Sequence, residues 1–334
     1  MSTRLTGAFG LEHPILSAPM AVAAGGWLAA AVSSAGGLGL VGGAYVDRDW
    51  IAAELDEAGD TPVGCGFITW ALERSPDVLD LVLERRPRAV MLSFGDPRPL
   101  GARVRDAGVP LICQVNSRPD ALLALEAGAD VVVAQGAEAG GHGAHHRSTL
   151  TLVPELADLL ADRSPDTLLC AAGGIADGRG LAAALMLGAD GVLIGSRLWA
   201  TTEAKVPTGL HDAALAADGD ATTLSRALDI ARGLPWPDRF SCRVLRNRFS
   251  ETWDGREAEL RDAGHTVGED WKRAFVAGDP DASNTIVGEA VGLIHGVQPA
   301  ADVIERIVAE ATTLLGAHGT AASALRETDR GVDG

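Results

Sequence analysis

Basic residues are scarce in this chain of 334 residues: 28 Lys and Arg stand against 45 Asp and Glu, a formal net charge of −17. Nucleic acids and anionic membranes attract proteins through clustered Lys and Arg, so this balance argues against both as partners. Aromatic residues are also scarce at 4% of the chain, whereas Ala, Gly, Val and Leu are abundant. This composition favours close-packed helices and strands over an aromatic-rich β-sandwich.

The sequence contains no apolar run long enough to cross a membrane, and residues 1–6 lack the apolar core of a signal peptide. We therefore expect a cytoplasmic protein. Cysteines are few, and none belongs to a CxxC pair: they are Cys65, Cys113, Cys170 and Cys242. We interpret them as structural thiols in a reducing compartment.

Short apolar runs alternate with helical patterns along the first two-thirds of the chain, which is typical of parallel βα units. The predicted strands are 14–18, 38–41, 63–68, 89–94, 111–115, 131–135, 168–172 and 191–194. Helical patterns lie between them, among others at 27–35, 48–58, 119–127 and 179–187. Eight strands close a TIM-type (β/α)8 barrel, which is the α/β fold we predict. An open doubly wound sheet explains the alternation but not the strand count.

An internal repeat supports this fold. The segment 124–133 resembles 184–193: in both, a helix ends at a glycine, Gly128 or Gly188, and the next strand follows after two residues. Glycine adopts the left-handed conformation that commonly ends a helix. Repetition of one βα unit indicates a barrel built by stacking such units.

The pattern divides the chain into four regions. Residues 1–204 form the predicted barrel, which we expect to bind a cofactor, for the reasons given below. Residues 205–290 are rich in Asp, Arg and helical patterns, and we predict a smaller, mostly helical insertion over the barrel mouth. Residues 291–318 return to the barrel, with an amphipathic pattern at 303–315 as its last outer helix. Residues 319–334 are predicted to be a flexible tail.

Glycine-containing turns follow directly after the last two predicted strands: Gly173-Gly174 and Gly195-Ser196. In β/α barrels the loops after strands seven and eight commonly bind phosphate through backbone N–H groups and a helix N-terminus. Glycine lets an anion approach the backbone because it has no Cβ. Either turn alone is also explained as a tight connection. Together, at these two strands, they predict a phosphate-bearing cofactor.

A histidine loop follows the sixth strand, in the run Ala-Gln135-Gly-Ala-Glu-Ala-Gly140-Gly141-His142-Gly. Gly140 and Gly141 leave the backbone bare, which suits a ligand lying flat against the chain. His142 is the predicted catalytic residue, either as a general base or, when charged, as a stabiliser of an anion. Gln135 offers both a donor and an acceptor. A flexible loop with an incidental histidine is the alternative.

Other motifs carry less information. Ala18-Pro19-Met20 at the end of the first strand could form a wall for a planar ring or simply pack in the core. Residues 37–42 match GxGxxG, but the match spans the second strand instead of following a strand, so we reject a dinucleotide fingerprint. His142, His145 and His146 do not have the spacing of a zinc site, and we predict no metal.

In this order, these motifs resemble the nitronate monooxygenase family, once called 2-nitropropane dioxygenases, and its relative, the FMN-dependent enoyl-ACP reductase. The likeness runs from residue 14 to 197 and resumes at 244–247 and 288–296. It implies FMN, with the phosphate at Gly173, Gly174, Gly195 and Ser196. It also places the flavin ring near Ala18, Pro19, Met20, Gln135, Gly140 and Gly141, and makes His142 the active-site histidine.

One position departs from the family pattern. Many members have an Asn in a Gly-x-Asn-Phe run at the third strand, where this chain has Gly66, which can contact a flavin only through its backbone. Trp70, just beyond that strand, either narrows the pocket or packs under the insertion.

The resemblance implies oxidation of alkyl nitronates by dioxygen to a carbonyl compound and nitrite. The alternatives are an NAD(P)H-dependent FMN reductase acting on quinones or enoyl thioesters, and a flavin-binding module without catalysis. The expected partners are a small-molecule substrate and dioxygen, and a homo-oligomer is compatible with the sequence.

Overall fold

A computed structural model of the chain describes residues 1–329, with side chains through residue 317. Every predicted barrel strand is present: β1 (Ile15–Ser17), β2 (Leu40–Ala44), β3 (Gly64–Ile68), β4 (Val90–Ser93), β5 (Leu111–Val115), β6 (Val131–Gln135), β8 (Leu168–Ala172) and β9 (Gly191–Ile194). These eight strands pair in parallel in the order β1-β9-β8-β6-β5-β4-β3-β2. A parallel bridge between Leu16 and Leu38 brings the two edges together. The predicted TIM-type barrel is therefore confirmed.

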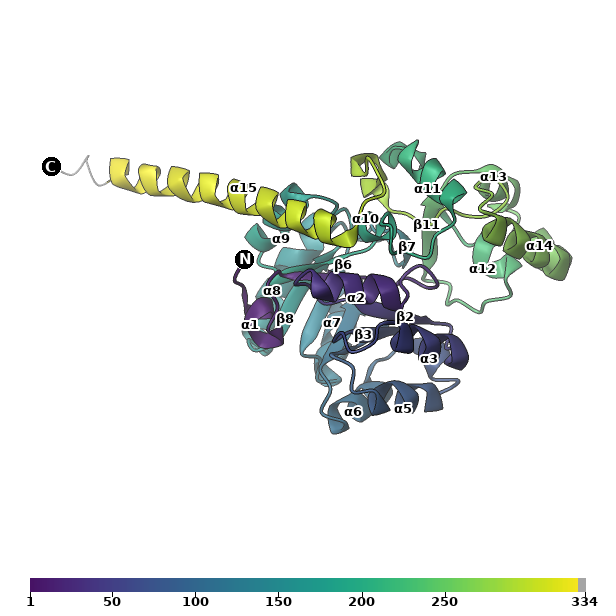
Figure 1. The fold of residues 1–334 in the computed structure, drawn as a ribbon, viewed down its shortest axis with the longest axis horizontal. Coiled ribbons are helices and arrows are strands. Elements are labelled where there is room, and N and C mark those ends of the chain that lie inside the picture. The colour runs from purple at the N-terminus through teal and green to yellow at the C-terminus, as the bar shows by residue number, and fades with distance from the viewer. Residues whose placement is uncertain (330–334) are drawn as a thin grey trace.

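Helices alternate with the strands and cover the outside of the barrel (Figure 1). They are α2 (Gly26–Ser34), α3 (Arg48–Glu57), α5 (Asp77–Glu84), α6 (Arg98–Asp106), α7 (Arg118–Glu126), α8 (Thr149–Arg163) and α9 (Gly178–Met186). Two short helices, α4 (Thr69–Leu72) and α10 (Ser196–Trp199), follow β3 and β9 at the carboxyl ends of the strands. The two repeat glycines have the expected left-handed backbone, with φ of 76° at Gly128 and 96° at Gly188. Each ends its helix and lets the next strand begin.

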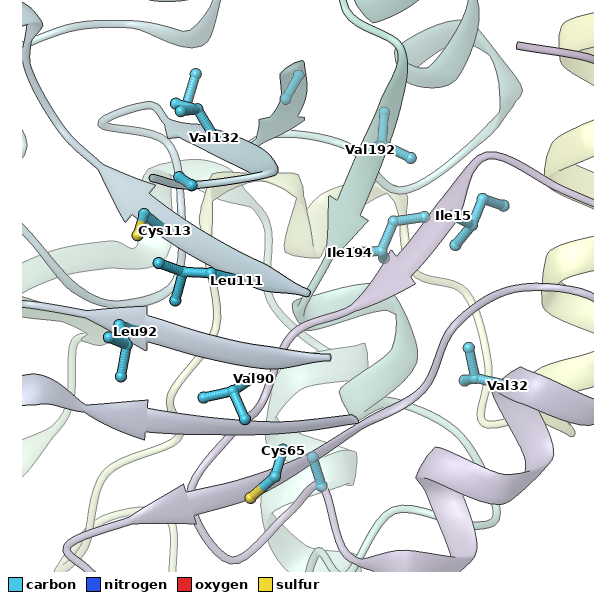
Figure 2. Packing of buried hydrophobic residues seen from close by; sticks show 14 of the residues in the cluster. Ile15, Val32, Cys65, Val90, Leu92, Leu111, Cys113, Val132, Val192 and Ile194 are labelled. Carbon is cyan, nitrogen blue, oxygen red and sulfur yellow. The ribbon is translucent and has the colours of Figure 1, made fainter. Parts of the chain in front are cut away.

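Two apolar layers hold the barrel together, because successive side chains of a strand point to opposite faces. Val90 and Leu92 of β4 belong to the cluster between strands and helices (Figure 2), whereas Met91 belongs to a separate inner cluster. The N-terminal helix α1 (Arg4–Phe9) adds Leu5 and Phe9 to the inner cluster. Both faces of the sheet are thus buried, which is why the strands are continuous apolar runs in the sequence.

The last helix, α15 (Ala300–Asp329), packs against α9 and α2 and extends beyond the barrel (Figure 1). Val303, Ile304 and Ile307 form its buried stripe. The predicted outer helix at 303–315 is therefore part of a longer one. Helix α15 continues across most of the segment 319–334, whose flexibility stays a prediction, and residues 330–334 lie outside the described part of the chain.

The insertion contains helices and two strands. Its elements are α11 (Thr208–Leu215), a 3-10 turn (Gly219–Ala221), β10 (Thr222–Ser225), α12 (Ala227–Ala231), β11 (Ser241–Leu245), α13 (Arg248–Trp253), α14 (Glu257–Ala277) and a second 3-10 turn (Glu289–Leu293). The strands were not expected from the sequence. They form an antiparallel sheet with β7 (Gly141–Gly143) in the order β10-β11-β7. The insertion is therefore hydrogen-bonded directly to the histidine loop of the barrel.

All four cysteines are free and buried. Burial raises the pKa of Cys65 and of Cys113 to about 12, so these groups stay protonated thiols at neutral pH. Within residues 1–329, no helix combines the length and the apolar character needed to cross a membrane.

Candidate active site

A cavity opens at the carboxyl ends of the barrel strands, between the barrel and the insertion. Every residue predicted for the site lines it: Ala18, Pro19, Met20, Gly66, Gln135, Gly140, Gly141, His142, Gly173, Gly174, Gly195 and Ser196. The insertion adds Arg232, Trp236 and Asn284 to the lining. The structure thus brings the predicted residues together in one place, and the contacts of each with a cofactor stay predictions.

The glycine turns after β8 and β9 form one wall of the cavity. Gly173 and Gly174 have φ values of 102° and 74°, which side-chain-bearing residues rarely adopt. A Cβ added to Gly173 would lie 3.1 Å from the Gly136 carbonyl oxygen. The backbone N–H groups of Gly173, Gly174, Gly195 and Ser196 donate no hydrogen bond to any described residue. A bare backbone with unpaired donors is suited to hold an anion.

Pro19 lies directly against Gly66 across the barrel mouth. A Cβ at residue 66 would come within 2.3 Å of Pro19 Cγ and 2.5 Å of Pro19 Cβ. Since a proline ring is stiff, an Asn at this position would require the Ala18–Met20 segment to move. Gly66, which replaces the Asn of the family pattern, therefore allows the Ala18–Met20 segment to pack closely against β3. An Asn side chain would leave no room for this packing.

Gln135 has mainly a positioning role. Its Nε2 donates to the His142 carbonyl oxygen at 3.0 Å. Its Oε1 accepts from Gln114 Nε2 and Asn116 Nδ2, both at 2.9 Å. Gln135 Oε1 thus already accepts two hydrogen bonds, and only the second N–H of Nε2 is left for a ligand.

His142 sits on β7, whose partner β11 places Cys242 opposite it. Its Nε2 lies 2.8 Å from Asp229 Oδ2, and the other carboxylate oxygen of Asp229 accepts from Arg232 Nη2 at 2.9 Å. Asp229 lies in the middle of α12 and Arg232 directly after it, so the insertion supplies both. The Asp229 side chain is only 4% exposed. Burial lowers the pKa of His142, and the hydrogen bond and charge of Asp229 offset only part of this effect.

Aromatic rings surround His142. Its imidazole stacks on Trp236 with 3.6 Å between ring centroids and 4° between planes, and Phe94 meets it edge-on at 6.3 Å. Trp236 Nε1 in turn donates to Tyr45 Oη at 3.1 Å. Trp70 packs edge-on against Trp236 at 5.4 Å and does not line the cavity, which decides the alternative left open by the sequence: Trp70 packs under the insertion.

His145 of the same loop contacts the backbone through both ring nitrogens, and His146 is exposed. His145 Nδ1 and Nε2 lie 3.1 Å from the carbonyl oxygens of Ala137 and Ser241, respectively. Among residues 1–329, no group of three or more His, Cys, Asp or Glu side chains is placed to hold a metal ion.

Sequence reasoning missed the residues that complete the histidine site: Tyr45, Asp229, Arg232 and Trp236. Pro235-Trp236-Pro237 stands near the middle of the insertion, but nothing in the sequence indicates that its tryptophan stacks on His142. Asp229 and Arg232 are 87 and 90 positions from His142 (229 − 142 and 232 − 142), within an acidic and basic segment that looks like an ordinary solvated helix. Only the pairing of β11 with β7 brings them to the imidazole.

Eight parallel strands with a glycine-lined cavity and a buried His–Asp pair at their carboxyl ends define a TIM-barrel enzyme. The model of the nitronate monooxygenase family matches residues 2–66 and 70–310, and the chain belongs to this family of oxidoreductases. A nitronate monooxygenase, npaC, of Metarhizium robertsii is 37% identical over 90% of this chain and 91% of its own length.

Two other proteins are similar to this chain over nearly its whole length. An indene-carboxyl-CoA dehydrogenase of Mycobacterium tuberculosis is 30% identical and covers 98% of this chain and 99% of its own. The solved structure of FabK from Thermotoga maritima superimposes with a TM-score of 0.82 at 32% identity, covering 96% of this chain and 99% of that one. Relatives of similar identity thus carry names for different substrates, so family membership alone does not define the substrate.

Proposed function

We propose that this protein uses FMN to oxidise alkyl nitronates with dioxygen, giving a carbonyl compound and nitrite. Family membership supports the reaction class. The observation that carries the proposal is the buried pair of His142 and Asp229, whose imidazole lines the same cavity as the glycine turns. A basic imidazole beside a flavin site suits substrates that react as carbanions.

The residues present fit FMN. The unpaired N–H groups of Gly173, Gly174, Gly195 and Ser196 would hold its phosphate, and the Ala18–Met20 segment would form the wall beside its ring. When bound, FMN accepts electrons from the substrate and passes them to dioxygen. The protein contributes the binding, the orientation and the handling of the proton.

His142 is the proton acceptor in this proposal. Because its Nε2 lies on the Asp229 carboxylate, Nε2 carries the ring proton. Nδ1 has no hydrogen-bond partner among the described residues and is left as the acceptor. The lowered pKa keeps the ring neutral at pH 7, which favours a base over a cationic stabiliser. Nδ1 takes the α proton of a nitroalkane, and the electron pair of the broken C–H bond remains on the nitronate.

A preformed nitronate needs no proton removal, and this difference tests the role. His142→Ala should lower kcat/KM for neutral nitroethane by about 10²–10⁴-fold and that for ethyl nitronate much less, with FMN still bound. His265→Ala, on the exposed side of α14, is the matched control and should leave both values unchanged. An equal loss on both substrates would instead assign His142 to electrostatic stabilisation of the anion.

The reaction itself is tested by mixing the purified yellow protein anaerobically with ethyl nitronate and, separately, with NADH. We expect fast loss of the yellow flavin colour only with the nitronate, followed by recovery of the colour and release of nitrite when air is admitted. Faster bleaching by NADH than by the nitronate would contradict the proposal.

The second candidate is an NAD(P)H-dependent FMN reductase acting on quinones or enoyl thioesters. The likeness to FabK and to the carboxyl-CoA dehydrogenase favours it, since both resemble this chain over nearly their full lengths. Bleaching by NADH in the same anaerobic experiment, with reoxidation by a quinone or an enoyl thioester, would establish it.

A further inference from the structure

Two tryptophans of the insertion occupy the acceptor atoms of two polar side chains in the cavity. Trp236 Nε1 donates to Tyr45 Oη at 3.1 Å, and Trp271 Nε1 donates to Asn284 Oδ1 at 2.8 Å. An indole N–H can only donate. Each of these oxygens already accepts a hydrogen bond from an indole, and the hydroxyl hydrogen of Tyr45 and the amide hydrogens of Asn284 are left to donate.

These hydrogens have no acceptor in the protein. Asn284 is 0% exposed, lines the cavity, and its Nδ2 has no hydrogen-bond partner among the described residues. No described residue accepts from the hydroxyl of Tyr45 either. A buried amide NH2 without a partner costs free energy unless a ligand or water accepts from it.

Arg232 joins the two donors into one cluster. Its guanidinium carbon lies 5.6 Å from the Tyr45 ring centroid and 4.9 Å from that of Trp271, the residue that orients Asn284. Nη2 is used by Asp229 and Tyr45, and Nε by the Leu228 carbonyl oxygen. Nη1 has no partner among the described residues, and Arg232 lines the cavity. Each of the three side chains thus has a hydrogen-bond donor without an acceptor in the described part of the protein.

We propose that the unpaired donors of Tyr45, Arg232 and Asn284 form a subsite that binds the oxygen atoms of an anionic group of the substrate. The proposal rests on the proposed function only in taking this cavity as the substrate site. It assigns substrate recognition to three residues outside the glycine turns and outside the His142–Asp229 pair. We expect no binding of alkylammonium ions, because they can only donate and would meet the charge of Arg232 and the same unpaired donors.

Tyr45 is the only tyrosine of the chain, which gives a direct readout. Protein labelled with 3-fluorotyrosine has a single ¹⁹F resonance, and the FMN-bound protein can be titrated with butanoate or with butylammonium, neither of which is oxidised. We expect a saturable shift with butanoate and none with butylammonium. Equal shifts with both ions, or no shift with butanoate, would overturn the proposal.

Two variants test the assignment. Asn284→Asp keeps the acceptor for Trp271 but turns the donor into a second acceptor, and it should weaken butanoate binding at least about tenfold. Thr285→Val is the matched control: this neighbouring hydroxyl is also buried and unpaired but does not line the cavity, so binding should not change. Unchanged binding in Asn284→Asp, or an equal loss in both variants, would contradict the assignment.

Tyr45→Phe provides an independent test, because butanoate binding can also be followed by the perturbation of the flavin absorbance. We expect a loss of similar size to that of Asn284→Asp, and full binding in this variant would remove Tyr45 from the subsite.

Competition between butanoate and ethyl nitronate under anaerobic conditions would place the nitronate oxygens in the subsite, whereas simultaneous binding would assign the subsite to a second anionic group of the substrate. Butanoate binding that is lost in Asn284→Asp, in a protein that does not oxidise nitronates, would uphold the subsite and refute only the proposed function.

Discussion

In the proposed mechanism Asp229 holds His142 in the form that can accept a proton, and Asp229→Asn tests this positioning role. Asn has the same shape, but its amide NH2 can donate to Nε2 in place of accepting from it. The imidazole proton would then sit on Nδ1, the nitrogen without a partner among the described residues, and the base would be lost. Activity should fall although every side chain keeps its place.

The magnitude follows from the hydrogen bond that selects the tautomer. The contact between His142 Nε2 and Asp229 is 2.8 Å long and shielded, with the carboxylate 4% exposed. Hydrogen bonds to charged groups contribute about 1.5–3 kcal/mol. Loss of that preference lowers the population of the competent tautomer about 10- to 150-fold, and kcat/KM for neutral nitroethane should fall by the same factor.

The assay is the pH profile of kcat/KM for nitroethane in the wild type and in Asp229→Asn. Burial lowers the pKa of His142 and Asp229 opposes this effect, so removing the carboxylate lowers the pKa further. The base then stays neutral to a lower pH, and the acid limb of the profile should move to lower pH. A purely structural defect would lower the rate without moving the limb.

Asp254→Asn is the matched control. Asp254 belongs to the same insertion, bonds to Ser225, and lies outside the cavity lining. It should change neither the rate nor the acid limb. The reasoning is refuted if the limb in Asp229→Asn stays in place or moves to higher pH, or if the wild type does not act on neutral nitroethane.

Two glycine substitutions test the cofactor wall. Gly66→Ala should destabilise the protein by about 1–3 kcal/mol, because its Cβ would lie 2.3 Å from Pro19 Cγ, whereas Gly264→Ala, in open space on α14, should be neutral or slightly stabilising in thermal unfolding. Gly174→Ala should reduce the FMN retained after dialysis. Gly255→Ala, with a similar φ of 80° against 74° but no neighbour within 4 Å, should cost similar backbone strain and keep its FMN. Equal FMN content in these two variants would remove Gly174 from the phosphate site.

The barrel could be predicted from the sequence because its information is local. Each strand is a continuous apolar run between turn residues, and both repeat glycines end their helices where the pattern indicated. The turns after β8 and β9 could also be predicted. Their glycines are local signals, and a barrel places the loops after successive strands at one face.

The partners of His142 could not be predicted, because they depend on a pairing between distant segments. Asp229 reaches the imidazole only through the contact of β11 with β7, and β11 reads as an unremarkable five-residue run, Ser241–Leu245, inside a segment dominated by helical patterns. For Gln135 the position could be predicted, but its hydrogen-bond partners could not. Its acceptor is consumed by Gln114 and Asn116, whose side chains give no sign in the sequence of turning toward it.

This division between barrel and insertion has a consequence for the family. The barrel turns supply the backbone donors that would hold FMN, whereas Asp229, Arg232, Trp236 and Asn284, which contact the histidine or line the cavity, all come from the insertion. On the proposed assignment, we expect a change of substrate to alter the insertion and Tyr45 and to leave the turns after β8 and β9 as they are. Two relatives, 37% and 30% identical to this chain, carry names for a nitronate and a CoA-linked substrate, which is consistent with this expectation.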